Sequence, residues 1–324
     1  MRRTFDVLRI LADGREYSGR ELADRLGVTR AAVWNQIQRL RKEGVEIAGA
    51  AGHGYQLVGG YEFLDGELLL NELRAREGAN IARIDVHDVT TSTNQLLLEA
   101  SAEGDIHQHL VFADYQSAGR GRRGDRWLSA PGSGLCFSLG WRFDTPPATF
   151  SALSLVVGVA LIAALEKHGI DDVRLKWPND LVRGPAKLAG ILIEMRSEAG
   201  GPCVTVIGIG LNIFMSEFAR SLIDRPVEDL SQVSGQRLSR QAVAQNVVAA
   251  LARELEIFSQ SGFGAYRDRW LALDALANKE VAINLGPRIV RGVARGVDEH
   301  GAILIEHEGR RERFLAGHIV EFGT

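Results

Sequence analysis

The chain has 324 residues, which is long enough for two or three domains and excludes a single small binding module. Hydrophobic residues make up 45% of the sequence and charged residues 24%, which excludes a mainly disordered chain. Lys and Arg number 38 against 41 Asp and Glu, so there is no overall basic surplus and any site for an anion must be local.

The cysteines, the N-terminal residues and the longest apolar run indicate the cellular compartment of the protein. Cys136 and Cys203 lie in apolar runs, which is typical of buried thiols in a reducing compartment. Residues 1 to 13 are amphipathic and lack the apolar core of a signal peptide. The uncharged stretch from Phe150 to Leu165 is shorter than the roughly 20 residues that span a bilayer. We therefore expect a cytoplasmic protein that has no membrane contact.

Residues 4 to 42 have the pattern of three short helices. A first helix is predicted over residues 4 to 12, and Ser18 with Glu21 fits a capping box at the start of a second helix. Thr29 can cap a third helix, whose apolar positions face inward and leave polar and basic side chains exposed. Two helices joined by a short turn that contains glycine form the arrangement of a DNA reader.

A hairpin punctuated by Gly49, Gly52 and Gly54 is predicted over residues 44 to 57, as the wing of a winged helix-turn-helix domain that covers residues 1 to 63. This domain holds ten Arg or Lys against eight Asp or Glu, so its affinity for DNA should be salt-sensitive and modest in a monomer. A role in protein interaction is the alternative. The expected DNA-binding residues are Ser18, Thr29, Arg30, Asn35, Gln38 and Arg39.

Helical and strand patterns mix over residues 64 to 276, which predicts an α/β (α+β) domain of catalytic size. Helices are expected near residues 65 to 76, 93 to 102, 150 to 168 and 239 to 259, and strands near 108 to 115, 135 to 143, 173 to 177, 188 to 196 and 203 to 213. Residues 277 to 324 contain short β-rich runs separated by turns, which predicts a small β-barrel of about 50 residues.

The segment Gly119 to Gly124 reads Gly-Arg-Gly-Arg-Arg-Gly and matches the glycine pattern of dinucleotide folds. In those folds the pattern opens a helix, whereas here the following Ala130 to Gly134 contain a proline and two glycines and cannot form one. Three arginines among three glycines are typical of a mobile cationic loop that grips a phosphate or a carboxylate. An exposed, arginine-rich surface turn is the alternative.

Three further motifs place polar groups or bare backbone beside apolar strands. Lys176 to Asp180, of sequence Lys-Trp-Pro-Asn-Asp, emerges where its proline ends strand pairing. Lys187 lies at the start of an apolar strand. Gly208 and Gly210 lack side chains on one face of another strand, which could therefore form one wall of a ligand pocket. Each motif has a structural alternative: a turn, a snorkelling lysine and tight sheet packing, respectively. Thr90 to Gln95 either caps a helix or binds a polar ligand.

Taken in order, these motifs closely resemble those of the biotin protein ligases. A winged helix ahead of them is similar to the members that are both biotin ligase and repressor of the biotin operon. One departure is Thr91, where these ligases often carry an acidic residue or a serine. The residues that carry the resemblance are Ser92 to Asn94, Gly119 to Gly124, Lys176 to Asp180, Lys187 to Glu194 and Gly208 to Asn212.

The resemblance implies a central domain similar to class II synthetases, followed by an SH3-like β-barrel. It also implies an ATP-dependent reaction with Mg²⁺, in which the biotin carboxylate attacks the α-phosphate and gives biotinyl-adenylate and pyrophosphate. A lysine of a biotin carboxyl carrier domain then takes the biotinyl group. The complex with biotinyl-adenylate is expected to form a homodimer that binds operator DNA as a repressor of biotin synthesis. The motifs assign no metal-binding residues.

By similarity, biotin is expected to contact Ser92, Thr93, Asn94, Gln116, Arg120, Gly121, Arg122 and Lys187. The adenylate or ATP is expected to contact Arg120, Arg122, Arg123, Trp127, Lys176, Asn179 and Asn212. The residues expected to act in catalysis are Lys187, Asp180, Arg122 and Lys176, with Asp180 orienting the incoming lysine or helping to deprotonate it. Trp127 and Trp177 form either walls of the ligand site or parts of the core.

Two other functions stay open at the level of sequence. A lipoate ligase is related in fold and reaction, but it should lack the arginine-glycine loop and the winged helix. A regulator whose ligase-like domain only senses biotin would need no transfer chemistry, which Lys187, Asp180 and Arg122 are suited to provide. The C-terminal barrel could contact either ATP or the carrier protein.

Overall fold

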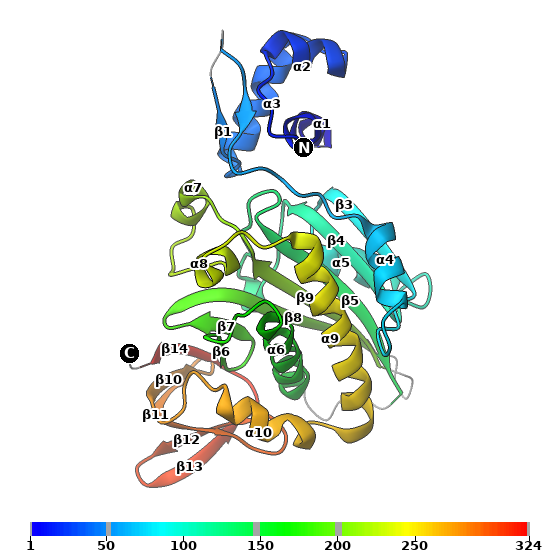
Figure 1. Ribbon diagram of the computed structural model, residues 1–324. Helices are drawn as coiled ribbons and strands as arrows, with labels where there is room; N and C mark the ends of the chain where they lie inside the picture. The colour runs from blue at the N-terminus through cyan, green and yellow to red at the C-terminus, as the bar shows by residue number, and fades with distance from the viewer. Residues whose placement is uncertain (1, 50–52, 145–149, 198–202, 323–324) are drawn as a thin grey trace.

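The computed structural model describes residues 2 to 49, 53 to 144, 150 to 197 and 203 to 322. Figure 1 shows a small N-terminal unit set above a larger body, with the C-terminal strands at the opposite end of that body. Gly52, at the expected tip of the wing, lies outside the described residues. None of the helices in the described ranges has the length and apolar composition of a membrane span.

The N-terminal unit is a winged helix-turn-helix domain, as predicted. Both predicted caps form: Ser18 Oγ accepts from the Glu21 N–H while Ser18 N donates to the Glu21 carboxylate, and Thr29 Oγ1 accepts from the Ala32 N–H. Apolar side chains of all three helices pack into a core of their own. The elements are α1 (Arg2–Leu11), α2 (Gly19–Leu26), α3 (Arg30–Lys42), β1 (Ile47–Ala48) and β2 (Gln56–Leu57).

The larger body is built on a seven-stranded sheet of order β3-β4-β5-β9-β8-β7-β6. The pairing of β3 with β4 is parallel, and all other pairings are antiparallel. The long central strands are apolar on both faces because helices cover both. The strands are β3 (Arg83–Thr90), β4 (His109–Gln116), β5 (Gly134–Phe143), β6 (Arg174–Lys176), β7 (Asp180–Arg183), β8 (Ala186–Ser197) and β9 (Cys203–Asn212).

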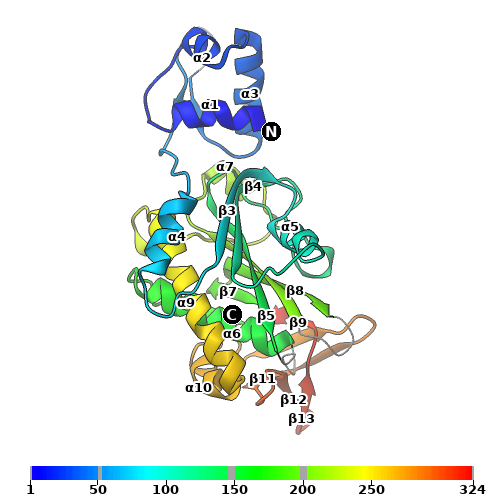
Figure 2. The same ribbon diagram turned by 90° about the vertical axis from the view of Figure 1, so that its right-hand side faces the viewer.

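Helices pack on both faces of this sheet, as Figure 2 shows. On one face α4 (Gly66–Arg74), α6 (Phe150–Glu166) and α9 (Arg240–Ser261) contribute to the main core. On the other face lies α5 (Thr93–Ala100), whose Leu97 packs with Val111 and Val206 in a separate cluster. The start of α5 therefore lies over the middle of the sheet, where β5 and β9 run side by side.

The C-terminal strands form one antiparallel sheet of order β13-β12-β11-β10-β14. This agrees with the predicted small β domain. Its buried Val281 and Ile283 belong to the same hydrophobic core as α6, and Trp177 Nε1 donates to the carbonyl of Gly301 at 3.1 Å. The strands are β10 (Glu280–Asn284), β11 (Ile289–Val297), β12 (Ile303–His307), β13 (Arg310–Phe314) and β14 (His318–Phe322).

Several elements were not predicted. Strand β3 is an edge strand in which charged residues alternate with Ile84 and Val86, and β7 is four residues long and begins inside the expected turn after Pro178. Strand β14 and the helices α7 (Glu217–Ser221), α8 (Leu230–Ser234) and α10 (Gly264–Ala272) were also missed. All six are short or exposed on one side, so their hydrophobic periodicity is weak.

The winged helix contacts the body at the end of α3. Gly44 follows this helix with φ of +91°, and a Cβ atom there would lie 2.9 Å from Cβ of Ala130. Ser216 Oγ donates to the Gly44 carbonyl at 3.0 Å, and Arg9 of α1 forms an ion pair with Asp88 of β3. Glycine is required at position 44 both by its backbone conformation and by this close approach.

Candidate functional site

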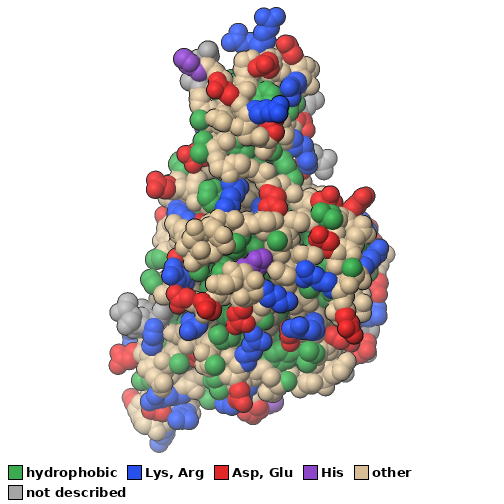
Figure 3. All heavy atoms as spheres, in the orientation of Figure 1, with side chains coloured by type: hydrophobic (Ala, Val, Ile, Leu, Met, Phe, Trp, Pro, Cys, Tyr) green, Lys and Arg blue, Asp and Glu red, His purple; other side chains and the backbone are tan. Residues whose placement is uncertain are grey.

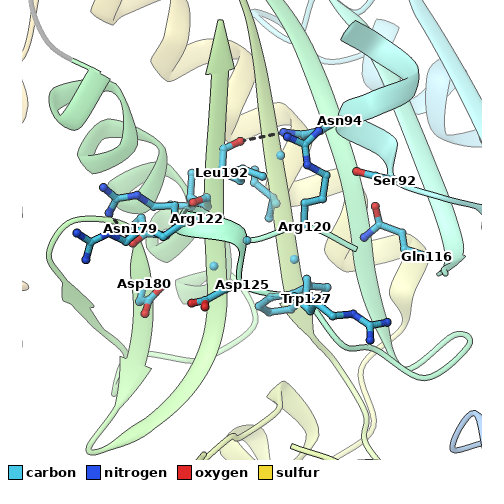
Figure 4. A pocket seen from close by; sticks show the side chains of 18 of the residues that line it. Ser92, Asn94, Gln116, Arg120, Arg122, Asp125, Trp127, Asn179, Asp180 and Leu192 are labelled. Atoms are coloured by element: carbon cyan, nitrogen blue, oxygen red, sulfur yellow. Dashed lines mark hydrogen bonds between the residues drawn. The ribbon is translucent and has the colours of Figure 1, made fainter. Parts of the chain in front are cut away.

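A cavity opens on the face of the sheet that carries α5, over β8 and β9. Figure 4 shows Ser92 and Gln116 at one end of it, Asn179 and Asp180 at the other, and Trp127 with Asp125 between them. Residues separated by more than 200 positions in the sequence thus meet in one place. The lining residues expected from the sequence are Ser92, Thr93, Asn94, Gln116, Arg120, Gly121, Arg122, Arg123, Trp127, Asn179, Asp180 and Lys187.

The end of the cavity next to α5 is polar and buried. Ser92 is the N-cap residue of α5, but its side chain makes no capping hydrogen bond. Its hydroxyl, on a residue only 3% exposed, is therefore not used as a cap and faces the cavity. The backbone N–H and the hydroxyl of Thr93 both donate to Gln116 Oε1, at 2.8 and 3.2 Å. The helix-cap alternative therefore does not describe the side chain of Ser92.

Asn94 is fixed by a network of buried hydrogen bonds. Its Nδ2 donates to Glu194 Oε2 at 2.9 Å, and its Oδ1 accepts from Ser138 Oγ at 2.5 Å. Arg120 holds the other oxygen of the same carboxylate, with Nη2 2.5 Å from Glu194 Oε1. Ser138 and the carboxylate of Glu194 had not been singled out as site residues, because each lies in an apolar strand and is separated from Asn94 by more than 40 residues.

The arginine-glycine loop is a closed turn that bends back over the cavity. Gly121 N donates to the Asp125 carbonyl at 2.7 Å, and Trp127 N donates to the Gly119 carbonyl at 3.0 Å. The loop contains a short 3-10 turn instead of a helix, which excludes a dinucleotide fold. Arg122 Nη1 donates to Asn179 Oδ1 at 3.3 Å, and burial lowers the pKa of the Arg122 guanidinium.

Lys187 and Asp180 form an ion pair at the far end of the cavity. Lys187 Nζ lies 2.6 Å from Asp180 Oδ1, and both side chains are largely buried. They come from the neighbouring strands β7 and β8, in which Asp180 lies opposite Gly190. The ammonium group also lies 5.8 Å from the ring centroid of Trp127. A cation held in this way can face an anionic ligand without leaving its carboxylate partner.

The glycines of the sheet make room for the site, as expected. A Cβ atom on Gly208 would lie 2.1 Å from Oδ1 of Asn94, and one on Gly210 would lie 2.2 Å from Cε2 of Trp127. The bare face of β9 is therefore occupied by the side chains that form the floor of the cavity. Trp127 lines the cavity, whereas Trp177 is 1% exposed and belongs to the core.

Two expected ligand contacts do not line the main cavity. Lys176 lies opposite Asp180 in the β6–β7 pairing and is half-buried, and burial lowers the pKa of its ammonium group. Asn212 Nδ2 donates to the Glu228 carbonyl at 3.1 Å and lines a smaller adjacent cavity with Lys187. Asn212 is buried, and its Nδ2 also lies 3.5 Å from the backbone carbonyl oxygen of Lys187.

His318, Arg225 and Asp125 line the cavity but were not expected from the sequence. His318 begins β14, so the C-terminal sheet contributes a side chain to the site. Burial and the nearby cations Lys176 and Arg123 lower the pKa of the His318 imidazole, while Asp180 and Asp125 oppose this shift. No motif surrounds His318 in the sequence, since only the packing of the C-terminal sheet brings it to the cavity.

Comparisons with known proteins identify the class of this fold and site. Residues 86 to 212 match the model of the biotin/lipoate A/B protein ligase family, residues 3 to 56 match a helix-turn-helix domain, and residues 277 to 320 match the biotin protein ligase C-terminal domain. The structure is similar to that of the biotin protein ligase from Aquifex aeolicus in complex with biotin and ATP. The TM-score is 0.62 at 26% identity, over 75% of this chain and 97% of that one.

Full-length relatives narrow the assignment. The chain is 38% identical to the bifunctional ligase/repressor BirA of Escherichia coli over 97% of its own length and 95% of the relative's. It is 32% identical to BirA of Bacillus subtilis over 94% of each chain. The chain therefore belongs to the family of bifunctional ligase/repressors, which are biotin protein ligases with an N-terminal DNA-binding domain. The resemblance found in the sequence motifs is confirmed.

Proposed function

We propose that the cavity joins biotin to ATP as biotinyl-5′-adenylate and that the biotinyl group then passes to a lysine of a carrier domain. The observation that supports this best is the polarity of the cavity. Neutral donors and acceptors, Ser92, Thr93 and Gln116, gather at one end, and the cations Arg122 and Lys187 lie towards the other. A neutral ring system bearing a carboxylate tail fits between them.

At the neutral end, Ser92, Thr93, Asn94 and Gln116 would hydrogen-bond the ureido ring of biotin. Their network is already complete around Asn94, which fixes the donors before the ligand arrives. Arg120 is paired with Glu194 and would close this end, together with the backbone of Gly121.

At the cationic end, Arg122 and Lys187 would stabilise the charge that develops when the biotin carboxylate oxygen bonds to the α-phosphorus. The bond from the α-phosphorus to the bridging oxygen breaks, and pyrophosphate leaves. Arg123, Trp127 and Asn179 would contact the nucleotide, and Asn212 would support the backbone of Lys187. The positions of Lys176 and Asn212 outside the main cavity make their contacts indirect.

In the transfer step, the amine of the carrier lysine forms an amide bond with the acyl carbon, and AMP leaves. The amine must lose a proton in this step, and Asp180 is the carboxylate paired with Lys187 at the cationic end. Asp180 is paired with Lys187, so it would orient the incoming ammonium group first and accept its proton only as the ion pair loosens.

Mg²⁺ would accompany ATP. The described residues contain no cluster of three or more His, Cys, Asp or Glu suited to hold a metal ion. Mg²⁺ is commonly bound by one or two carboxylates together with substrate phosphates, and Asp125 and Asp180 are the carboxylates that face the cavity. The ion would supply positive charge to the triphosphate.

We also propose that the complex with biotinyl-adenylate forms a homodimer and that its winged helices bind an operator as a repressor of biotin synthesis. The exposed side chains of Arg30, Asn35 and Arg39 on α3 support DNA contact, and the helix caps Ser18 and Thr29 would approach phosphates. We assign DNA binding to residues 1 to 63 and ligation to residues 64 to 276. Residues 277 to 324 would complete the ligand site by contributing His318.

Calorimetric titration with biotin, with and without Mg²⁺-ATP, followed by the mass of a carrier domain, tests the ligase proposal. Biotin binding that tightens with Mg²⁺-ATP and a biotinyl-lysine mass shift are the expected results. Arg122→Gln should keep biotin binding and lose the nucleotide effect, whereas Arg269→Gln, a surface control paired with Glu166, should behave as wild type. Binding without transfer would favour a biotin-sensing regulator.

A further inference from the structure

Trp34 is an exposed aromatic side chain on the recognition helix α3. It is 47% exposed, whereas Val33 and Ile37 of the same helix are completely buried. The core of the winged helix includes Val33 and Ile37 and does not include Trp34. Indole offers one of the largest apolar areas of any side chain, so leaving it in water forgoes stabilisation of the fold. A single exposed apolar residue is common on proteins, so its surroundings decide its meaning.

The surroundings of Trp34 are those of a DNA-reading surface. Ala31, Trp34, Asn35 and Gln38 are spaced three, one and three residues apart, which places them next to one another on the helix. Helix α3 contains no acidic residue, and its last turn is basic. Figure 3 shows both basic and acidic side chains on this domain, so the lack of acidic residues is a feature of α3 and not of the whole domain. Among the positions of α3 that lie three or four residues from Trp34, only Ala31 is an exposed apolar residue, which is too little for a protein interface.

We propose that Trp34 is a specificity-determining residue of operator recognition that contacts the 5-methyl group of a thymine in the major groove. This inference rests on the DNA-binding function proposed above. Thymine alone among the bases presents a methyl group there, and apolar side chains recognise it. The indole N–H can donate to a neighbouring purine N7 or thymine O4. Asn35 and Gln38 are suited to adenine, so a half-site with A·T pairs satisfies all three residues.

The test uses the full-length protein with biotin and Mg²⁺-ATP and a pool of random-sequence duplexes, from which bound molecules are selected and sequenced. Each thymine of the selected duplex is then replaced singly by uracil, which removes only the 5-methyl group. For the wild type we expect one thymine in each half-site at which uracil weakens binding by about fourfold, the value of one methyl group. Trp34→Ala should bind about five- to 150-fold more weakly and lose this sensitivity.

Two variants serve as controls. Trp34→Phe keeps an apolar ring and should keep the response to uracil. Ile289→Ala removes a similarly exposed apolar side chain, 54% exposed, from the C-terminal sheet at the other end of the molecule (Figure 1), and should leave DNA binding unchanged. Thermal unfolding of Trp34→Ala shows whether the winged helix stays folded. A wild type that responds to uracil at no thymine overturns the proposal without any variant.

Three further outcomes distinguish a failure of the DNA-binding function from a failure of the role given to Trp34. If the wild type selects no sequence from the pool, the DNA-binding function itself is overturned. If it selects a sequence but Trp34→Ala has the same uracil profile, only the role of Trp34 is wrong. If Trp34→Ala changes the oligomeric state and leaves the DNA profile unchanged, the residue belongs to a protein contact, and the proposal is wrong.

Discussion

The hydroxyl of Tyr115 donates a hydrogen bond to Glu43 Oε2 across the boundary between the ligase body and the winged helix, at 2.6 Å. Tyr115 precedes Gln116, which lines the cavity, and Glu43 is the C-cap residue of the recognition helix. Burial and the neighbouring Glu43 raise the pKa of the Tyr115 phenol well above its ordinary value. The phenol therefore stays protonated and keeps donating this hydrogen bond at alkaline pH. Tyr115 alone thus links Gln116 of the ligand cavity to the end of helix α3.

Removal of this bond should weaken DNA binding more than biotin binding. A hydrogen bond to a charged group contributes about 1.5 kcal/mol or more, so Tyr115→Phe should lower the DNA affinity of the liganded protein by about tenfold. The matched control is Tyr17→Phe, which removes a bond of the same length to Asp13 within the winged helix. Fluorescence anisotropy with a selected duplex measures both. Equal affinities of Tyr115→Phe and wild type would show that domain orientation does not depend on this bond.

A methyl group at position 208 should destroy the biotin end of the cavity. Gly208→Ala places Cβ 2.1 Å from Asn94 Oδ1, and Asn94 cannot move without breaking its bonds to Ser138 and Glu194. We expect biotin affinity to fall about five- to 150-fold, because overpacking of this kind costs on the order of 1–3 kcal/mol. Gly264→Ala, at a helical glycine with no atom near its Cβ position, is the control. Calorimetry with biotin that shows unchanged affinity would contradict the assignment of this end.

Lys187 should matter for adenylation more than for biotin binding. Lys187→Gln removes the cation beside the reacting carboxylate, and loss of one such donor slows chemistry by about 10²–10³-fold. The burst of pyrophosphate in a single turnover measures this step directly. Lys167→Gln, at an exposed lysine after α6, should have the wild-type rate. If Lys187→Gln shows a normal burst followed by slow transfer, Lys187 acts in transfer to the carrier lysine and not in adenylation.

Stability should fall with rising pH because of Asp274, which lies in the turn after α10. Burial raises the pKa of this carboxyl to about 6, above its ordinary value of 3.8, and Oδ1 accepts from the Leu276 N–H. The folded state therefore binds the proton more tightly than the unfolded state, so the contribution is complete below pH 3.8 and is lost as pH rises through 6.

Asp274→Asn keeps the acceptor and removes the charge. Relative to wild type, it should gain stability as pH rises from 4 to 8, by up to about 3 kcal/mol. Urea unfolding at several pH values measures this. Asp268→Asn, at a fully exposed carboxylate of α10, should leave the pH profile unchanged. Parallel profiles of wild type and Asp274→Asn would mean that Asp274 is ionised in both states.

Local signals in the sequence predicted the winged helix and much of the site. The capping residues Ser18 and Thr29 fixed the starts of two helices, because a cap acts within three residues. The glycines at 208 and 210 predicted a bare strand face, and the structure places Asn94 and Trp127 against it. The cations Arg122 and Lys187 were predicted from the arginine-glycine loop and the strand-end motif for the same reason, because each motif is contiguous in the chain.

Long-range pairings could not be predicted in this way. Glu194 becomes a site residue only because β8 passes beneath α5, and His318 only because the C-terminal sheet packs on the body. Asn212 was expected to bind the nucleotide, but the local motif does not reveal that Glu228 lies within hydrogen-bond distance. These relationships depend on tertiary packing, which hydrophobic periodicity does not encode.

The shared core of the ligase body and the C-terminal sheet has a consequence for how the chain unfolds. Val281, Ile283 and Trp177 bury surface in common with α6, whereas the winged helix has a separate core. The winged helix is therefore expected to unfold as one cooperative unit. The ligase body and the C-terminal sheet are expected to unfold together as a second unit. Cutting the chain near residue 63 would leave each product with a core of its own, whereas a cut near residue 276 would divide one core and expose apolar surface on both products.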